Sequence, residues 1–504
     1  MGLFSWFLPK RAPPPVIPTD EVVPLRFVDS LYPISFDFST VFREPLDTEI
    51  LRASAEKVLR KPGWRELGAR VRRSQNGGLE YHLPREYSED RPALMFTTET
   101  HDMSIDEHPV LRKLPKATGE PTIFEPTAAS LRPYMRSPTT PQKLDDWLYN
   151  DIPQLSIHVV NFEDATTITL TMLHTLTDLM GVISFFREWL ATLHGREDTI
   201  LPYIGFRDQD PLENLQLGKQ PPRYMFADML LQGWNFFKFI IRDMIERFRY
   251  PDASLRFFSV PSSFVDKLTA SATAELASAQ KEQGLPTDQA FVTDSDVLCA
   301  WWTRLVVRQL GCAPERPVQL MNRFDSRGIL AKMGLLPDGG RVTLMGNAAY
   351  NASCFTPASR YLDDGYPLGR LAGEVRDSIT AHRTVEQLQA QDAAFRDIRR
   401  STGRPPIYGD PDMLICFFTN WYRGKLFQMD FSPAAVNRAT RGAGEEKTKR
   451  VTPVFMSCTG IESRWAMRNA TAILGKSNSG DWWLVSRLRR DVWEKIELEL
   501  KKMK

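Results

Sequence analysis

The residues whose types and spacing could do chemistry are His174 and Asp178, in the segment TLTMLHTLTDLMG (169–181). A histidine can act as a general base near neutral pH, because its ordinary pKa lies there, when a hydroxyl, thiol or amine comes within hydrogen-bond reach. Thr and Leu alternate before His174, which predicts a β-strand with the histidine at its end, where it can project into a cleft. The spacing of four residues is unspecific, however, and the pair alone is more simply interpreted as structural.

Other catalytic chemistries find no support in the motifs of the chain. It has no G-x-S-x-G, no phosphate-binding P-loop, and no G-x-G-x-x-G after a predicted strand. H-x-x-x-D could supply two metal ligands, but a third at matching spacing is missing, so no metal site is expected. Among the other histidines, His158 lies on the neighbouring predicted strand and is the competing candidate for a base.

The elements that must position His174 can be predicted from periodicity. The stretch QLSIHVVNFEDATTITLTML (154–173) predicts two short strands around an Asn-Phe-Glu-Asp turn. The stretch GVISFFREWLATLHG (181–195) predicts a helix that ends near Gly195. Its apolar face holds five side chains: Val182, Phe185, Phe186, Trp189 and Leu193.

The rest of the chain also alternates strands and helices, and its 504 residues suffice for two ordinary domains, so the fold class is α/β. We expect an N-terminal half over residues 1–205, a crossover with an apolar helix over 206–250, and a C-terminal half over 251–504. The apolar segment 225–250 has no uncharged run long enough to span a membrane. We predict that this helix is buried or lies between the domains, and an interfacial helix resting on a membrane is the alternative.

Composition excludes several classes of protein. Lys and Arg number 64 against 62 Asp and Glu, so the chain lacks the excess positive charge that dominates nucleic-acid affinity. The five cysteines are odd in number and widely spaced, without a C-x-x-C pair, which argues against a disulfide framework and a zinc site. We therefore expect a cytoplasmic protein that binds no nucleic acid.

The N-terminus, MGLFSWFLPKRAPPPVIP, carries a short apolar run that ends at Pro9. The run is too short for a secretory signal or a membrane span, and Trp6 stands where a myristoylation signal has Ser or Thr. We expect a tail that packs on the domain or is loose, with a membrane contact as the alternative.

Four further stretches carry a resemblance to a known family. FVTDSDVLCAWWTRL (291–305) is similar to S-T-N-D-x-L-x-A-x-x-W, NRFDSRG (322–328) to D-x-R, and LMGNAAY (344–350) to a G-N-A turn. FTNWYRGKLFQMDFSPA (418–434) is similar to T-S-W-x-R-x-P-x-Y-x-x-D-F-G-W-G. These stretches and H-x-x-x-D follow the family's order over residues 25 to 495. The chain therefore resembles BAHD-type acyl-CoA-dependent acyltransferases, particularly the fungal branch with the trichothecene acetyltransferases.

The chain departs from the family pattern at three places. D-F-G-W-G is replaced by DFSPA (430–434), which lacks both glycines and the tryptophan, and a rebuilt structural turn is expected there. Two residues separate Asp178 from Gly181, where the glycine often follows the aspartate directly. Lys425 stands where the family often has an apolar residue or proline, a departure that concerns the acceptor pocket.

The resemblance implies two chloramphenicol-acetyltransferase-like domains, each with a mixed sheet, joined by the crossover and with a channel between them. His174 would lie midway and take the proton from an acceptor hydroxyl as it attacks the thioester, without an acyl-enzyme. Asp178 would point away from the acceptor and pair with Arg327, as a structural contact.

The other site residues that the resemblance implies have simpler alternatives. Thr419 and Trp421 would face the reacting centre, where a hydroxyl or indole N–H could stabilise the oxyanion, although Trp421 is equally compatible with interdomain packing. Thr293, Ser295 and Asn347 would lie near the CoA arm. Asn347 could instead cap a turn.

The expected function is transfer of an acyl group, acetyl in the first place, from acyl-CoA to a hydroxyl of a hydrophobic secondary metabolite. Acyl-CoA is then a cosubstrate, no cofactor is bound permanently, and a monomer without a stable membrane span is expected. One alternative is a condensation-type enzyme using carrier-bound substrates. That class has a second histidine before the motif and a glycine after the aspartate, where this chain has Leu173 and Leu179. The other alternative is a non-catalytic scaffold that retains the fold.

Overall fold

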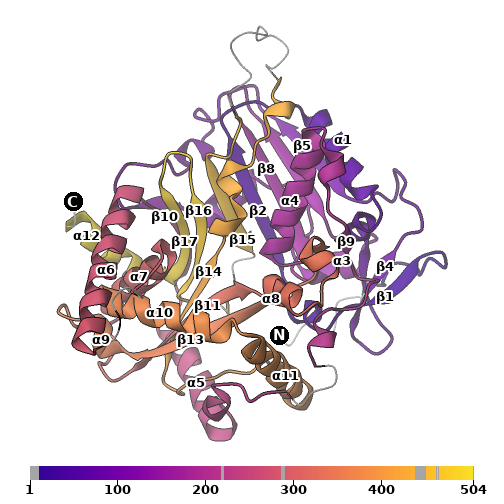
Figure 1. Cartoon of the computed structure of the whole chain (residues 1–504). Coiled ribbons are helices and arrows are strands. Elements are labelled where there is room, and N and C mark those ends of the chain that lie inside the picture. Colours follow the sequence, from indigo (N-terminus) through magenta and orange to yellow (C-terminus); the bar gives the residue numbers. More distant parts are fainter. Residues whose placement is uncertain are drawn as a thin grey trace.

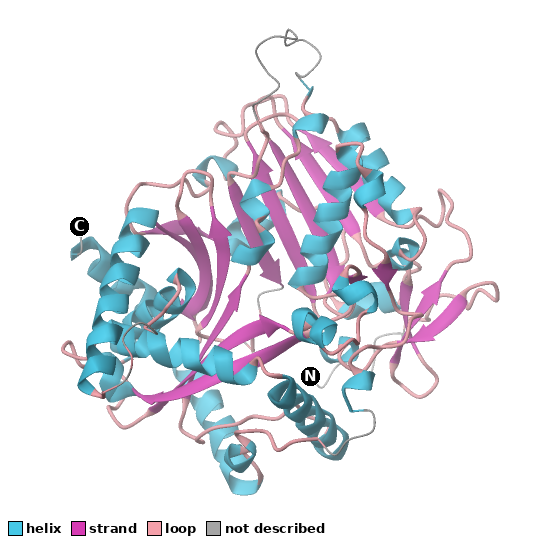
Figure 2. Cartoon of the chain, in the orientation of Figure 1, coloured by secondary structure: helices cyan, strands magenta, loops and turns pink. Residues whose placement is uncertain are grey.

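The computed structural model describes residues 11–216, 221–284, 286, 290–436, 450–460, 463 and 465–502. It is a mixed α/β structure whose described residues form two large sheets with helices packed against them (Figures 1 and 2). The α/β fold with two sheet-rich parts is therefore confirmed. The predicted tail over residues 1–10 lies outside the described residues.

The first sheet holds the strand that ends at His174. Its described part has five strands in the order β15 (Phe455–Gly460), β2 (Ser35–Phe42), β8 (Thr166–Leu173), β7 (Ser156–Asn161) and β5 (Met95–Thr100). Every residue of β2 and β8 is buried, although Ser, Thr and Asp alternate with apolar residues along both strands. The polar face is covered because Asp37 accepts hydrogen bonds from Thr171 (2.6 Å), Arg132 (2.5 Å) and Arg136 (3.2 Å). Both faces of this sheet therefore contribute to a rigid support for the histidine.

Helices α1 (Thr48–Leu59) and α4 (Leu179–Leu193) pack together against the apolar face of the first sheet (Figure 1). The Asp47 side chain caps α1 by accepting the backbone N–H groups of Glu49 and Ile50. The predicted strand, turn, strand and helix over 154–195 are confirmed as β7, β8 and α4, and Gly195 follows the helix with a φ of 67°. The change from alternating to helical periodicity thus placed His174 and Asp178 correctly between a strand and a helix.

The second sheet supplies the opposite wall of the site. Its described part has seven strands in the order β13 (Ala349–Pro357), β11 (Pro317–Asp325), β14 (Leu414–Asn420), β16 (Ala470–Lys476), β17 (Trp482–Arg489), β10 (Ala253–Val260) and β6 (Thr122–Thr127). β11 and β14 run parallel, so their carboxyl ends reach the same edge of the sheet.

Helices cover the second sheet and connect it to the first. Those on the sheet's side of the molecule are α6 (Ser262–Glu282), α7 (Asp294–Leu310), α9 (Ala358–Leu362), α10 (Leu368–His382) and α12 (Arg490–Lys502) (Figure 1). Shorter or peripheral helices are α2 (Ala128–Leu131), α3 (Leu144–Leu148), α8 (Arg327–Lys332) and α11 (Val385–Thr402). Two small sheets pair β1 (Glu21–Pro24), β4 (Leu79–Leu83) and β3 (Arg70–Arg73), and β12 (Thr343–Leu344) with β9 (Tyr203–Ile204).

Each large sheet contains a strand from the other end of the chain. β15 follows β14 in sequence but pairs antiparallel with β2 in the first sheet. β6 precedes β7 in sequence but pairs with β10 in the second sheet. In Figure 1 the orange β15 lies beside the indigo β2. The sheets are thus tied together by both of these strands, and the halves 1–205 and 251–504 stay a prediction.

The apolar segment 225–250 is the element whose environment was predicted wrongly. α5 (Gly233–Arg249) forms within it, but most of its residues are exposed, including Trp234 at 66% and Phe237 at 57%. Its other side faces inward, where Arg247 is buried. Hydrophobicity alone predicts that a helix has an apolar face, not that another element covers that face.

All five cysteines are free thiols in the structure. No helix among the described residues combines the length and the apolar character needed to cross a membrane.

Candidate active site

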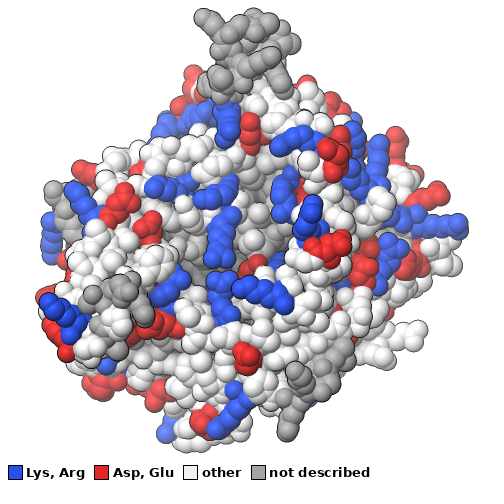
Figure 3. All heavy atoms as spheres, in the orientation of Figure 1, with Lys and Arg blue, Asp and Glu red and all other residues white. Residues whose placement is uncertain are grey.

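A cavity of about 1550 Å³ lies between the end of β8 and the strands β11 and β14. Figure 3 shows Lys and Arg side chains gathered around a hollow in the middle of the face drawn. Of the eight residues predicted for the site, seven line the cavity: His174, Asp178, Thr293, Ser295, Asn347, Thr419 and Trp421. Arg327 does not line it and contacts Asp178 from behind. The structure thus brings together residues from segments up to 247 positions apart in sequence.

His174 is held by its backbone and by two aromatic rings. Its N–H donates to the carbonyl of Ile34 at 2.7 Å, directly beyond the pairing of β2 with β8. The ring centres of Tyr32 and Phe36 lie 5.2 and 5.4 Å from the imidazole centre. Nδ1 is buried without a hydrogen-bond partner among the described residues, so Nε2 is the ring nitrogen available to the cavity.

A buried clamp fixes the backbone of His174 from the other side. The Asn347 side chain donates through Nδ2 to the His174 carbonyl at 2.8 Å and to Asp29 Oδ1 at 2.8 Å. The backbone N–H of Asn347 also donates to Asp29 Oδ1, at 2.7 Å. Asn347 and Asp29 are almost fully buried. Asn347 therefore positions the histidine in this structure, and its predicted place near the CoA arm stays a prediction.

The titration of two groups in this region is shifted in opposite directions. Burial lowers the pKa of His174, because the charged imidazolium loses hydration, and its weaker interactions with Asp178 and Asn347 do not offset that loss. His174 is therefore neutral at pH 7 and able to accept a proton. Burial raises the pKa of Asp29 to about 7, against hydrogen bonds from Asn347 that favour the anion.

Asp178 and Arg327 form a bidentate ion pair behind the histidine. Arg327 Nη2 donates to Asp178 Oδ1 at 2.9 Å, and Nη1 donates to Oδ2 at 3.1 Å. Arg327 also donates to Asp325 and to the carbonyls of Leu344 and Gly346. All five N–H donors of the guanidinium are thereby used. Burial alone would raise the pKa of Asp178, but the charge and hydrogen bonds of Arg327 outweigh it and hold that pKa below its ordinary value.

Asp178 also organises the turn into α4. Its side chain accepts the N–H of Gly181 at 3.2 Å as the helix N-cap, and the N–H of Ala348 at 3.0 Å. A Cβ at Gly181 would overlap the Thr177 hydroxyl and come within 3.0 Å of the Met345 carbonyl. The displaced glycine is thus required here by close packing, although it stands two residues later than in the family pattern.

Thr419 lies on the cavity side of β14, and Trp421 supports it. The Trp421 indole Nε1 donates to Thr419 Oγ1 at 3.1 Å, so the Thr419 hydroxyl proton is free to point elsewhere. The Trp421 side chain is 7% exposed and packs near Phe38. The indole N–H is therefore committed to Thr419, and Thr419 is the better placed of the two to donate to a developing oxyanion.

Thr293 and Ser295 lie at the N-terminus of α7. Thr293 caps the helix in a reciprocal arrangement with Asp296, which Arg376 of α10 also contacts. Ser295 Oγ accepts a hydrogen bond from Asn420 Nδ2 at 2.6 Å, which joins α7 to the end of β14. Both residues border the cavity, and their predicted proximity to the CoA arm stays a prediction.

Several arginines at the cavity have no carboxylate within 4 Å among the described residues, and two of them are Arg383 and Arg423. Burial lowers the pKa of Arg383, and the nearby charge of Arg423 acts in the same direction. Uncompensated cations at a cavity favour anionic ligands.

His158 does not compete with His174 as a base. It lies in β7, where its Nδ1 is 2.8 Å from the Thr97 hydroxyl, and it does not line the cavity. Among the described residues, no cluster of three or more His, Cys, Asp or Glu side chains could hold a metal ion.

Three residues around the site were missed by the sequence interpretation: Tyr32 and Arg323, which line the cavity, and the buried Asp29, which holds Asn347 behind it. Arg323 stands in the quoted NRFDSRG stretch, and strand alternation would have placed it on the same face as Asp325. Asp29 and Tyr32 carry no comparable signal, because their partners lie more than 140 residues away.

Known proteins resemble this chain over nearly its whole length. No family profile matches the chain. Acetyltransferase sphE of Aspergillus fumigatus is 35% identical over 99% of this chain and 98% of its own length. A relative from Sordaria araneosa, named transcriptional regulator sdnM, is 57% identical over 100% of both chains.

Two solved structures share the fold. The chain matches TRI101 of F. graminearum, complexed with coenzyme A and T-2 mycotoxin, with a TM-score of 0.63 and 12% identity, over 96% of this chain and 98% of that one. It matches vinorine synthase with a TM-score of 0.57 and 15% identity, over 97% and 95% of the respective chains. At these identities the structures establish the architecture, and the relatives establish the family.

Proposed function

The chain belongs to the BAHD-type acyl-CoA-dependent acyltransferases, and we propose that it transfers an acetyl group from acetyl-CoA to a hydroxyl of a hydrophobic secondary metabolite. The observation that carries the proposal is the state of His174, a neutral imidazole held at a strand end with one ring nitrogen available to the cavity. The size of the cavity supports two substrates bound together, because 1550 Å³ exceeds what one small molecule usually fills.

The proposed reaction is direct transfer in a ternary complex. His174 Nε2 takes the proton from the acceptor hydroxyl as its oxygen attacks the thioester carbonyl carbon. The Thr419 hydroxyl, which accepts the Trp421 N–H, donates to the oxyanion that forms. The C–S bond then breaks, and the imidazolium returns its proton to the CoA thiolate. Asp178 and Arg327 take no part in proton transfer because all their polar atoms are used by each other, by Asp325 and by the backbone.

The charges of CoA match the basic side of the cavity. Arg383 and Arg423 lack carboxylate partners among the described residues and would neutralise phosphate groups of the cosubstrate. In the solved relatives coenzyme A is bound by TRI101. The same complex contains T-2 mycotoxin beside coenzyme A, which supports a secondary metabolite as the acceptor here.

The proposal is tested by incubating the purified chain with acetyl-CoA and an extract of the host's metabolites, then measuring free CoA and a mass gain of one acetyl group. His174→Ala should abolish CoA release with little change in melting temperature, and His158→Ala is the matched control, which should retain activity. The rate should be constant at neutral pH and fall in acid with a pKa below 6.5, because only the neutral imidazole accepts the proton.

Two results would contradict the proposal. Retention of most activity by His174→Ala would remove the histidine from the mechanism. Absence of transfer with several acyl-CoAs and acceptors would favour a non-catalytic protein of this fold, in line with the regulatory name of the Sordaria relative. Turnover only with carrier-bound acyl groups would favour a condensation-type enzyme.

A further inference from the structure

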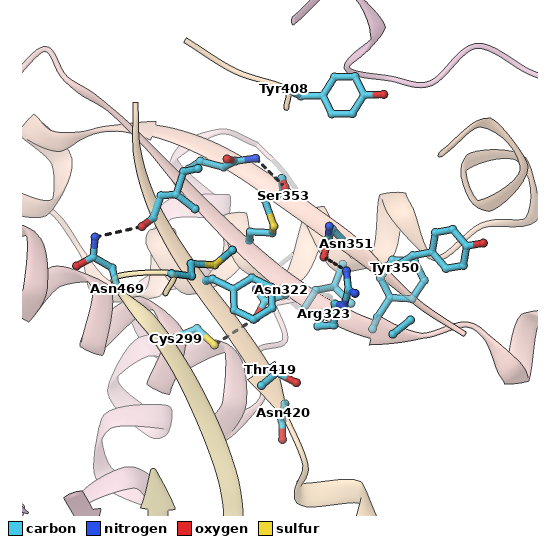
Figure 4. Close-up of a pocket in the computed structure, with 18 of the residues that line it drawn as sticks. Cys299, Asn322, Arg323, Tyr350, Asn351, Ser353, Tyr408, Thr419, Asn420 and Asn469 are labelled. Atoms are coloured by element: carbon cyan, nitrogen blue, oxygen red, sulfur yellow. Dashed lines mark hydrogen bonds between the residues drawn. The ribbon is translucent and has the colours of Figure 1, made fainter. Parts of the chain in front are cut away.

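Arg323 is a cation on the cavity wall, next to the place of reaction. At the end of β11 the odd-numbered residues Met321, Arg323 and Asp325 are the more exposed ones and share one face, and all three line the cavity. In the sheet register, Arg323 lies between Asn351 of β13 and Thr419 of β14. Figure 4 shows these three side chains on adjacent strands. Neighbouring strands are about 4.8 Å apart, so Arg323 is next to the proposed oxyanion donor.

The protein gives Arg323 neutral partners only. Nη1 donates to Asn351 Oδ1 at 2.9 Å, a bond drawn in Figure 4, and Nη2 donates to the Tyr32 hydroxyl at 2.7 Å. The guanidinium carbon lies 5.4 Å from the centre of the Tyr32 ring. Among the described residues no carboxylate comes within 4 Å of Arg323. The half-buried charge therefore keeps donors that the protein does not satisfy.

Two arginines of the same region, Arg327 and Arg376, are held in a different way. Arg327, the first residue of α8, pairs with two aspartates, and Arg376 pairs with Asp296. Both of these guanidinium groups hold the fold together. Arg323 instead is held in place by an amide and a phenol, which orient it without neutralising it.

Tyr32 links Arg323 to the histidine. The same tyrosine accepts the Arg323 hydrogen bond and places its ring 5.2 Å from the His174 ring. A group bound by Arg323 would consequently lie beside the substrates at the reacting centre.

We propose that Arg323 binds a carboxylate carried by one of the two substrates, either the acceptor or a dicarboxylic acyl group. The inference rests on the proposed function, because it assigns part of a substrate to the same cavity. A planar guanidinium with free N–H donors matches a carboxylate in a two-point contact, and the low polarity of the surroundings strengthens it. The preferred acceptor is then a hydrophobic hydroxy acid that receives the acetyl group, or a dicarboxylic acyl group from a thioester such as succinyl-CoA takes the place of acetyl.

Binding measurements test the inference without turnover. In the acceptor arm, adamantane-1-carboxylate and its neutral carboxamide are titrated calorimetrically into the protein saturated with CoA. In the donor arm, succinyl-CoA is compared with butyryl-CoA. We expect the carboxylate to bind about tenfold more tightly than its neutral match in one arm, and that arm identifies the substrate.

The variants separate the charge of Arg323 from its shape. Arg323→Met should reduce the tenfold preference to near unity, and Arg323→Lys should keep part of it, because the charge remains but the two-point contact is lost. Arg341→Met, at an exposed position that does not line the cavity, is the matched control and should leave the preference unchanged. Melting temperatures establish that each variant is folded.

The inference is overturned if neither carboxylate binds more tightly than its neutral match, or if the preference survives in Arg323→Met. Failure of the proposed function is a different result. In that case carboxylate binding depends on Arg323 while no acyl group is transferred to any acceptor.

Discussion

Replacing Asp178 by asparagine removes one charge of the buried ion pair while nearly preserving shape. The amide can still cap α4, since asparagine is as good an N-cap as aspartate. The substitution therefore isolates the interaction with Arg327, which Asp178 contacts at 2.9 and 3.1 Å. The matched control is Asp47→Asn, because Asp47 caps α1 without an ion pair among the described residues.

The size of the effect follows from which charge is left behind. Asp178→Asn leaves Arg327 with Asp325, 2.7 Å away, so we expect the lower end of the range for breaking a buried pair, about 3 kcal/mol. Arg327→Met leaves the Asp178 anion with only the N–H groups of Gly181 and Ala348, and should cost about 5 kcal/mol. Asp47→Asn should cost less than about 0.5 kcal/mol.

Urea denaturation followed by circular dichroism measures these free energies of unfolding. The double variant Asp178→Asn with Arg327→Met removes both buried charges. Its loss in free energy of unfolding should therefore be smaller than the sum of the two single losses by at least about 2 kcal/mol. The reasoning is refuted if both single variants lose less than about 1 kcal/mol, or if the two losses are additive.

Three further substitutions have distinct expected outcomes. Thr419→Val removes the hydroxyl that accepts the Trp421 N–H and is proposed to donate to the oxyanion. It should lower kcat about 100-fold with little change in KM, measured by CoA release. An unchanged kcat would exclude Thr419 as the oxyanion donor. Asp29→Asn should flatten the pH dependence of the free energy of unfolding. The pKa of the native carboxyl is raised to about 7, so between pH 3.8 and 7 the folded protein keeps this proton while the unfolded chain loses it. The free energy of unfolding of the wild type therefore falls by up to about 1.4 kcal/mol per pH unit over that window. The same slope in the variant would contradict this assignment. Lys425 has a φ of 50°, a strained backbone angle that glycine adopts freely, so Lys425→Gly should raise the free energy of unfolding by about 1 kcal/mol. A lower midpoint in urea would show that the packing of Lys425 over Tyr422 outweighs this strain.

The sequence predicted the local parts of the site well. The strand before His174 and the helix after Asp178 follow from a change in periodicity, which is set by neighbouring residues and can be recognised in one segment. The partner of Asp178 came from the resemblance, and the structure contains that ion pair. Such predictions succeed because strand and helix patterns, and an ion pair between two recognised motifs, can be identified without knowing the rest of the fold.

What could not be predicted depends on long-range pairing. Asp29 meets Asn347 across 318 positions, and nothing near either residue indicates the other. The placing of β15 beside β2 is decided by the competition among many strands for partners, not by the sequence of β15 itself. The exposure of α5 was missed for the same reason, since burial is a property of the surrounding elements.

The departure from the D-F-G-W-G pattern shows which parts of that motif the fold needs. Asp430 is retained, and its side chain accepts the N–H groups of Ser432 and Val451, while its carbonyl contacts His194 Nε2. Phe431 is retained and packs between Phe42 and Trp189.

The residues that replace the glycines adopt ordinary backbone angles. Positive φ occurs at Lys425 but at none of Ser432, Pro433 and Ala434, so this turn has no need of glycine. None of residues 430–434 lines the cavity. The motif therefore acts here through Asp430 and Phe431, which join this turn to α4 and β2. The lost glycines and tryptophan affect that junction and not the atoms that react.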